Sequence, residues 1–405
     1  MRAFRRILLP ILWAMVAFLP AARALGPVPA QLSDLEFWKL ITDSSEDGGG
    51  FISENFVSNE LGYPYVMPTL IQRARRDGAY IGVGPEQNFS YVAAIHPRIA
   101  FIVDIRRQNL VQHLLYKALF ELSATREDFL ALLFARKPTA HAPAGATVDQ
   151  LLALFEGAPP DEALHRANLD RVIDTLLKQH HFELTVDDRE TLRHVYDEFA
   201  RQGVETRYSV LPAILNTFAA QIVTVPVNPA PDDPGTPAPE ALARGGSRVL
   251  LLPMEFPSFS TVMKAADPAG KRWSFLATDE NYRTVRNMQQ KNLIVPLVGD
   301  FAGVKALRAV AQYLREHDTR VTAFYVSNVE QYLTPVSKLQ SFYLNVADLP
   351  IDESGTFIRT AQTSGKQPGP AQSFLSSMQT ALEAVRNGQA RVWNDILPLS
   401  LPLGQ

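Results

Sequence analysis

The 405-residue sequence contains no cysteine, which excludes several kinds of site at once. Without thiols the chain has no disulfide framework, no zinc site with thiolate ligands and no cysteine nucleophile. An excess of positive charge is also lacking, because 39 Lys and Arg residues stand against 42 Asp and Glu. We therefore expect no nucleic-acid partner. A hydrophobic content of 46% is typical of a packed globular protein rather than a disordered one.

Long apolar runs are scarce as well, and the one at the N-terminus is too short to span a bilayer. Residues 1–24 combine a basic start, an apolar run at 7–19 and a small-residue site that ends at Ala24. This pattern is typical of a secretory signal peptide cleaved after Ala24, since a membrane span needs about 20 apolar residues. An uncleaved anchor and a twin-arginine signal at Arg5-Arg6 are the alternatives.

The signal peptide predicts an exported protein, periplasmic or extracellular after cleavage. The segment holds four arginines and no acidic residue, so the remaining body carries a formal net charge of −7. We expect no stable membrane insertion of this mature chain, because no later apolar stretch approaches the length of a span. A cysteine-free sequence also suits an oxidising compartment.

From residue 25 onward, short β-prone runs alternate with amphipathic helical segments on both sides of a long helical region. The predicted strands are at 79–83, 99–105, 248–253, 292–299, 320–326, 341–346 and 355–362. The predicted helices outside the long region are at 33–46, 67–76, 88–95, 109–122, 278–291, 304–316, 329–333 and 371–387. Because the run at 99–105 is continuously apolar, it suits a strand buried on both faces.

This order predicts an α/β fold, a doubly wound and mostly parallel sheet of the Rossmann type with a helical insertion. The expected segments are a signal peptide (1–24), N-terminal helices with the first half of the sheet domain (25–124), the insertion (125–224), a proline-rich linker (225–247), the second half (248–364) and a tail with one helix (365–405). The linker contains VPVNPAPDDPGTPAPE, which has no helical or strand periodicity.

Glycine and polar residues follow the strand predicted at 79–83. In an open parallel sheet, ligands bind outside the carboxyl ends of the strands. Gly82 and Gly84 let a backbone approach a ligand closely, and the helix start behind them offers free N–H groups. Gly82, Gly84, Glu86 and Asn88 are therefore candidate cofactor-binding residues. Gln87-Asn88 stands where a dinucleotide fingerprint has its third glycine, which leaves room for a group smaller than a pyrophosphate.

Three later strands also end in polar residues. Asp104 lies twenty residues after the glycine turn, where a carboxylate can accept hydrogen bonds from a ribose diol. Asp300 follows the strand at 292–299, and Ser327-Asn328 follows the strand at 320–326. Each has a structural alternative, since a polar residue at this position often caps the next helix, and Asp104 can instead pair with Arg106 or Arg107.

The segments YIGVGPEQN, IVDIRR, LVGDF and FYVSN together resemble the four motifs of the class I S-adenosylmethionine-dependent methyltransferases. The resemblance implies S-adenosylmethionine as cofactor. It implies that Asp104 binds the ribose, that Asp300 and Phe301 lie near the adenine, and that Ser327 and Asn328 face the transferred methyl group. It covers about residues 50–122 and 274–346. The sequence also resembles a group of uncharacterised, often exported bacterial proteins in the runs SENFVSNE, GVGPEQNFSYVAA, FIVDIRRQN, YKALFELS, NLIVPLVGDFAG and AFYVSNVEQYL.

Two functions follow as hypotheses. One is a methyltransferase-like protein that binds S-adenosylmethionine or a related nucleoside and transfers a methyl group. The other is a non-catalytic binding or scaffold protein of the envelope that retains the fold. A metal site is not expected, because the histidines and aspartates near 180–194 have no spacing typical of a closed site.

Overall fold

The computed structural model describes residues 26–51, 53–207, 209–210, 224–226, 247–249, 256–361 and 371–400. The predicted signal peptide and most of the proline-rich linker lie outside these residues. Within the described part of the chain, no helix has both the length and the apolar character needed to cross a membrane.

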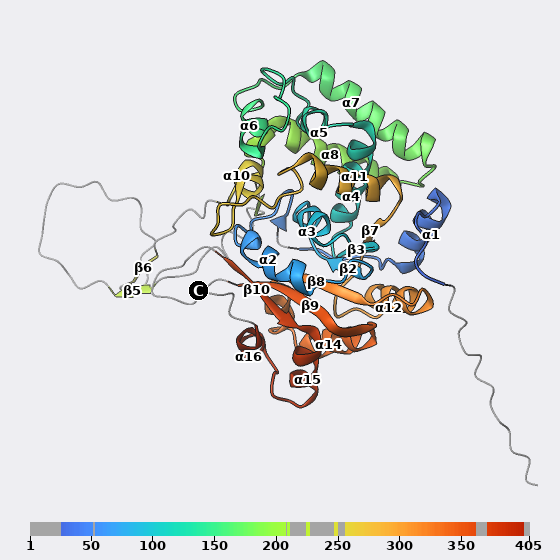
Figure 1. The fold of residues 1–405 in the computed structure, drawn as a ribbon, viewed down its shortest axis with the longest axis vertical. Helices are drawn as coiled ribbons and strands as arrows, with labels where there is room; N and C mark the ends of the chain where they lie inside the picture. The colour runs from blue at the N-terminus through green and yellow to red at the C-terminus, as the bar shows by residue number, and fades with distance from the viewer. Residues whose placement is uncertain are drawn as a thin grey trace, which may run out of the picture.

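A six-stranded, mostly parallel sheet forms the centre of the molecule (Figure 1). Its strands in chain order are β2 (Ala79–Gly82), β3 (Ile99–Asp104), β7 (Ile294–Val298), β8 (Val321–Ser327), β9 (Ile351–Ala361) and β10 (Gln372–Ser377). Their spatial order is β10-β9-β8-β2-β3-β7, and β10 alone runs antiparallel to its neighbour. The strand order reverses between β2 and β8, so a crevice is expected outside their carboxyl ends.

Helices cover both faces of this sheet. One layer contains α3 (Gln87–Ile95), α4 (Arg107–Leu122) and α11 (Asp279–Gln290), which contact one another. The opposite layer contains α1 (Asp34–Ser44), α12 (Ala306–Glu316), α14 (Leu339–Asp348) and α15 (Met378–Arg386). This arrangement explains why β3 is buried at every position and apolar from Ile99 to Val103, because neither of its faces meets water. The predicted α/β class with a mostly parallel sheet is therefore confirmed.

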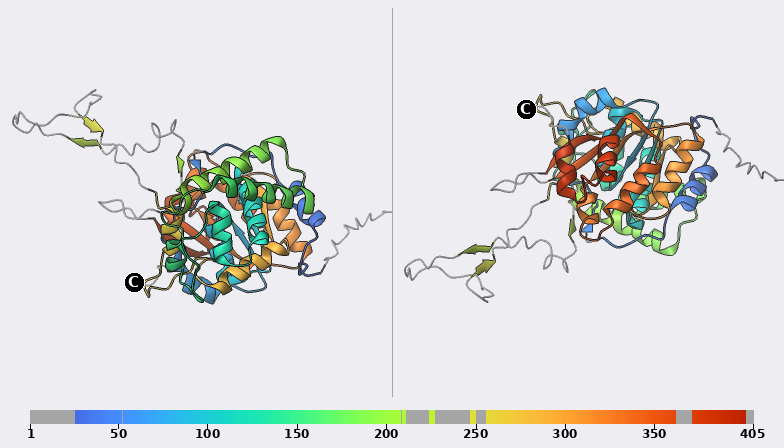
Figure 2. Two further views of the ribbon diagram at one scale, coloured as in Figure 1. Left: turned by 90° about the horizontal axis from the view of Figure 1, so that it is seen from above. Right: turned by 90° about the horizontal axis from the view of Figure 1, so that it is seen from below.

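The helical region between α4 and α11 stacks above the first layer of helices (Figures 1 and 2). Its elements are α5 (Arg126–Phe134), α6 (Val148–Ala153), α7 (Glu162–Asp174), the π-helix η1 (Thr175–Gln179), α8 (Val186–Gln202), the 3-10 turn η2 (Gly203–Glu205) and α10 (Phe259–Lys264). Threonine caps begin α5, α6 and α8, each with its hydroxyl accepting a backbone N–H three residues on. The longest of these helices, α8, packs on α4 and so connects the region to the sheet.

The remaining elements are short, except for the 11-residue helix α2 (Tyr63–Arg73), which packs on β9, β10 and α3. The short elements are β1 (Ser53–Glu54), β4 (Ser209–Val210), β5 (Thr224–Pro226), β6 (Ser247–Val249), α13 (Val329–Leu333), α16 (Trp393–Ile396) and η3 (Leu397–Leu399). β1 pairs with β4 and β5 pairs with β6, both antiparallel. β6 begins the run that was predicted as a strand at 248–253, and the end of that run lies outside the described residues.

One sequence prediction was wrong, and another was wrong in part. The run at 341–346 was predicted as a strand but lies within helix α14, where Leu339, Phe342, Tyr343 and Val346 form one buried stripe. Their spacing of three and four residues is helical, and it outweighs the β propensity of the aromatic side chains. The predicted helix at 371–387 begins only at Met378, because the residues before it pair with β9 as strand β10.

Candidate functional site

The glycine turn after β2 surrounds the side chain of Asn88. The Asn88 amide nitrogen donates to the carbonyl oxygens of Val83, Gly84 and Pro85 at 3.0, 3.0 and 2.7 Å. A Cβ on Gly82 would lie 1.9 Å from Asn88 Oδ1, so only glycine fits there. Asn88 therefore shapes this turn from within.

Gly84 differs from Gly82 in its surroundings. Its φ of +77° favours glycine, and no heavy atom lies within 4 Å of the position a Cβ would take. Gly84 is nevertheless buried. A hollow therefore lies beside the glycine turn, at the strand ends where a ligand is expected.

Asp104 ends β3 and is held by the residue two positions later. Arg106 donates to Asp104 Oδ1 from its backbone N at 2.9 Å and from Nε at 3.0 Å, and to Oδ2 from Nη2 at 2.8 Å. A carboxylate accepts about four hydrogen bonds, so three are filled and one lone pair on Oδ2 stays available. Asp104 thus pairs with Arg106, as the structural alternative predicted, and its carboxylate can still accept one further hydrogen bond.

Helix α4 carries two buried polar residues one turn apart, Asn109 and His113, and His113 contacts the glycine turn. His113 Nε2 lies 2.9 Å from the Gly84 carbonyl oxygen, so this nitrogen carries the proton. Burial lowers the pKa of His113 to about 4, which keeps the ring neutral. Among the described residues, His113 Nδ1 has no hydrogen-bond partner, and neither does Asn109 Oδ1 or Nδ2.

These unpartnered atoms are costly. Asn109 and His113 are 1% and 2% exposed, and each unpaired buried polar group costs about 1–3 kcal/mol. Native proteins pair nearly all such groups, and an exception indicates a water, a ligand or strain. The amide offers a donor beside an acceptor, and the imidazole offers a second acceptor.

Two buried carboxyl groups lie at the carboxyl ends of β2 and β8. Glu86 accepts from the backbone N of Ser58 at 3.0 and 3.3 Å, and burial raises the pKa of Glu86 to about 7. Glu60 accepts from Gln87 Nε2 at 3.3 Å and from the hydroxyls of Ser327 and Thr360. Burial also raises the pKa of Glu60, although these donors oppose the shift.

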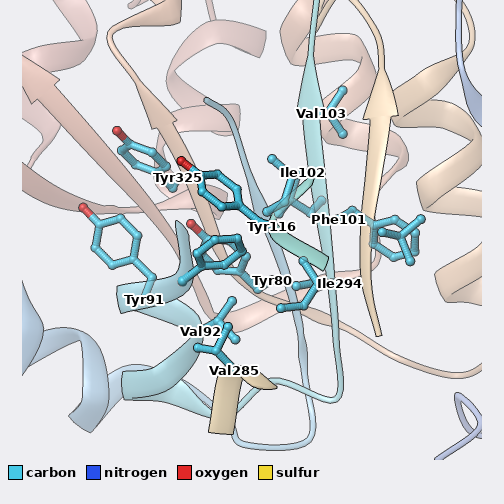
Figure 3. Packing of buried hydrophobic residues seen from close by; sticks show 14 of the residues in the cluster. Tyr80, Tyr91, Val92, Phe101, Ile102, Val103, Tyr116, Val285, Ile294 and Tyr325 are labelled. Carbon is cyan, nitrogen blue, oxygen red and sulfur yellow. The ribbon is translucent and has the colours of Figure 1, made fainter. Parts of the chain in front are cut away.

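Three tyrosines surround this carboxyl cluster. Gln87 Nε2 lies 3.1 Å from the hydroxyl of Tyr91 and 3.4 Å from that of Tyr325. The rings of Tyr80, Tyr91 and Tyr325 gather beside the strands (Figure 3), with 5.0 Å between the centroids of Tyr91 and Tyr325. Perturbed carboxyl groups in a cleft are typical of functional sites, although structural networks produce them too.

Ser327 and Asn328, the candidates for the transfer step, border the same cluster. Ser327 ends β8 with a φ of +52°, an uncommon conformation for serine that the surrounding contacts must hold. Its hydroxyl donates to Glu60 and lies 3.4 Å from Asn328 Oδ1. The turn therefore joins the predicted pair to a carboxylate from the N-terminal segment.

Asp300 and Phe301 lie outside this cluster. Asp300 accepts from the backbone N of Ala302 at 2.9 Å and from Lys338 Nζ at 2.8 Å. Phe301 is buried between Phe324 of β8 and Phe342 of α14, with ring centroids 5.1 and 5.6 Å away. These contacts give both residues roles in the turn after β7 and in the core.

Sequence reasoning did not single out Glu60, Asn109 or His113 as site residues. Glu60 ends the run SENFVSNE, which carried part of the resemblance but follows no predicted strand. The detectable signal for Asn109 and His113 was their spacing, because polar residues four apart on a helix lie on one face, and Lys117 and Glu121 continue the same row.

The histidine and aspartate residues near 180–194 separate in the structure. His180 contacts Glu121 and Asp34, Asp188 pairs with Arg107, and His194 pairs with Glu54. No group of three or more metal-ligating side chains converges within the described residues.

A cavity of about 660 Å³ opens elsewhere, between α6 and the segment before α11. Its guanidinium groups are already paired, Arg126 with Asp279 at 2.7 Å and Arg272 with Asp149 at 2.5 and 2.9 Å. We favour the crevice over this cavity because buried atoms without partners lie at the crevice.

The strand order and the helical layers on both faces of the sheet define a Rossmann-like α/β protein. Residues 55–147 and 258–393, more than half of the chain, match the family described as a domain of unknown function (DUF7790), and the chain belongs to that family. The unmatched stretch between the two segments contains α6, α7 and α8. A comparison with curated proteins finds no match to this chain.

Proposed function

We propose that the crevice beside the glycine turn binds S-adenosylmethionine or a related nucleoside, in keeping with the resemblance to methyltransferases. The observation that carries the proposal is the pair Asn109 and His113, whose buried polar atoms lack partners beside a hollow at Gly84. A ligand that satisfies these atoms would remove an energetic cost of about 1–3 kcal/mol for each of them.

The chemistry of the donor set fits a nucleoside. The Asn109 amide matches a heterocycle edge that presents a donor beside an acceptor, as adenine does. His113 Nδ1 can accept from a hydroxyl or an amine, and the free lone pair of Asp104 can accept from one ribose hydroxyl. The buried Glu60 and Glu86 would favour a ligand that carries positive charge.

S-adenosylmethionine, when bound, supplies an electrophilic methyl group on a sulfonium centre. The chain's own contribution to transfer is orientation and exclusion of water. Ser327 and Asn328 lie at the end of β8 beside Glu60, whose raised pKa suits it to receive a proton from an acceptor through the Ser327 hydroxyl.

Isothermal titration calorimetry with S-adenosylmethionine, S-adenosylhomocysteine and adenosine tests the proposal. We expect heat with at least the first two at millimolar ligand, and weaker binding by about tenfold or more in Asn109→Leu. Asn59→Leu is the control variant, because it makes the same replacement at an amide that is only half-buried. Absence of heat with all three ligands would contradict the proposal.

A non-catalytic binding protein is the second candidate, and the glycine turn favours it. Asn88 collects three carbonyl oxygens of the turn, and Arg106 fills three of the four positions on Asp104. A ligand would thus meet a turn that is already filled from within. Equal affinity for S-adenosylmethionine and adenosine, with no consumption of the former by envelope extracts, would favour this candidate.

A further inference from the structure

The N-terminal segment between α1 and β1 crosses the carboxyl ends of β3 and β7. The backbone N of Glu46 donates to the Val298 carbonyl oxygen at 2.9 Å, and the N of Gly49 donates to the Ile105 carbonyl oxygen at 2.8 Å. Gly48 has a φ of +91°, and its Cβ position lies 3.0 Å from a methyl group of Val298. The segment therefore lies directly on the strand ends.

One carboxylate fixes this segment to the start of α12. Glu46 Oε1 accepts from the backbone N of Lys305 and of Ala306, and Oε2 accepts from the N of Asp300, all at 3.0 Å. Lys305, at the cap position, makes no side-chain cap of its own. Glu46 thus caps α12 from a distant part of the chain, where a negative charge also complements the helix dipole.

Phe51 forms the far end of the segment. Its ring lies 5.9 Å from the guanidinium carbon of Arg106, the residue that holds Asp104, and 5.1 Å from the ring of Tyr332. Tyr332 in turn interacts with Asn328. Phe51 therefore lies between the candidate ribose position at Asp104 and the candidate transfer position at Asn328.

We propose that residues 45–51 form a lid over the crevice, held closed by Glu46 and completed at its tip by Phe51. The lid regulates entry to the nucleoside site and so rests on the function proposed above. Gly48, Gly49 and Gly50 give it the conformational freedom to open, since three consecutive glycines resist little rotation. The closed state excludes water from the crevice, and the open state admits the ligand.

The hydrogen bonds of Glu46 to the start of α12 form the latch that holds the lid closed. Hydrogen exchange measured by mass spectrometry on the full chain tests this latch without any ligand. In Glu46→Gln, we expect the amides at 46–49 and 300–306 to exchange about tenfold faster, because charge-assisted bonds are lost. Asp47→Asn is the matched control, since it removes the same charge from the neighbouring exposed residue. Equal exchange in the two variants would overturn the latch.

Stopped-flow binding of S-adenosylhomocysteine tests the lid itself. We expect faster association in both Glu46→Gln and Phe51→Ala than in Asp47→Asn or the wild type. Association that is unchanged in both variants would overturn the lid while leaving the nucleoside site intact. Faster exchange in Glu46→Gln with no binding of any nucleoside would support the latch and contradict the proposed function.

Discussion

Helix α4 buries polar side chains in both of its halves, and the two halves treat them differently. In the C-terminal half, Lys117 Nζ donates to Glu121 at 2.6 Å, to the Gln289 carbonyl oxygen at 2.8 Å and to Asn292. In the N-terminal half, Gln112 donates to the Phe56 carbonyl oxygen at 2.6 Å, but Asn109 has no partner among the described residues. Buried polar groups that only hold a fold together are expected to be paired, so Asn109 is the residue of α4 that the proposed ligand contact would explain.

The polar cluster around Lys117, in the C-terminal half of α4, joins α4 to three other parts of the chain. These are the C-terminal end of α11, the helical region and α1. Glu121 also lies 2.6 Å from His180, which follows the π-helix of the helical region, and His180 lies 2.9 Å from Asp34 at the start of α1. The His180 ring stacks on Phe182 with 5.0 Å between centroids. This cluster fastens α1, α4 and the helical region to one another, which is a structural task that needs no ligand.

The largest expected effect on stability comes from removing Lys117, the cation of the polar cluster in the C-terminal half of α4. Lys117→Ala leaves Glu121 and its neighbours buried without their cation, and we expect a loss of about 3–5 kcal/mol in the free energy of unfolding. Urea denaturation measures it. Lys39→Ala is the matched control, since Lys39 also pairs with an acid four residues later but is exposed, and its loss should stay below about 0.5 kcal/mol. Similar losses of stability in both variants would refute the structural role of the Lys117 cluster.

The second prediction concerns His113. Its native pKa of about 4 lies below the value of about 6.5 in the unfolded chain, so only the unfolded state takes up a proton between these values. Stability should therefore fall by about 3 kcal/mol as the pH drops from about 6.5 to 4, and His113→Gln should lack this part of the fall. The free energies of unfolding of the wild type and of His113→Gln, measured across this pH range, test the prediction. An equal fall in stability in the two proteins would contradict it.

His180 should show the opposite dependence on pH. Burial opposes its protonation, but the carboxylates of Glu121 and Asp34 outweigh burial and raise the pKa of His180. Its stabilising contribution is then complete below the unfolded pKa and is lost as the pH rises through the native one. We expect the stability difference between wild type and His180→Gln to shrink from pH 6 to pH 9, as His180 loses its proton. A difference that grows with pH would refute the pairing.

The central sheet was predictable from the sequence because its strands are covered on both faces. The stretches 99–103 and 293–298 are apolar throughout, which signals a buried strand without reference to any distant residue. The run at 341–346 was misread because aromatic residues suit both a strand and a buried helix face, and only its packing against the sheet decides between them.

The candidate site was predictable only where its residues follow strands. Asp104, Ser327 and the glycine turn were named on that basis. Glu60 was missed because its partners Ser327 and Thr360 are 267 and 300 positions away in the chain. The lack of hydrogen-bond partners for Asn109 could not be predicted either, because a sequence shows that a residue is polar but not whether its buried atoms find partners.

The measurement that tests the central claim most directly is the thermal stability of Asn109→Leu with and without S-adenosylhomocysteine. If Asn109 lacks a partner until a ligand binds, replacing it with an apolar side chain of similar size should leave the ligand-free protein as stable, or more stable by about 1 kcal/mol. It should also reduce the rise in Tm on adding ligand, in keeping with binding that is about tenfold weaker. A ligand-free variant destabilised by more than about 1 kcal/mol, or one that keeps the full ligand-induced rise, would contradict the claim.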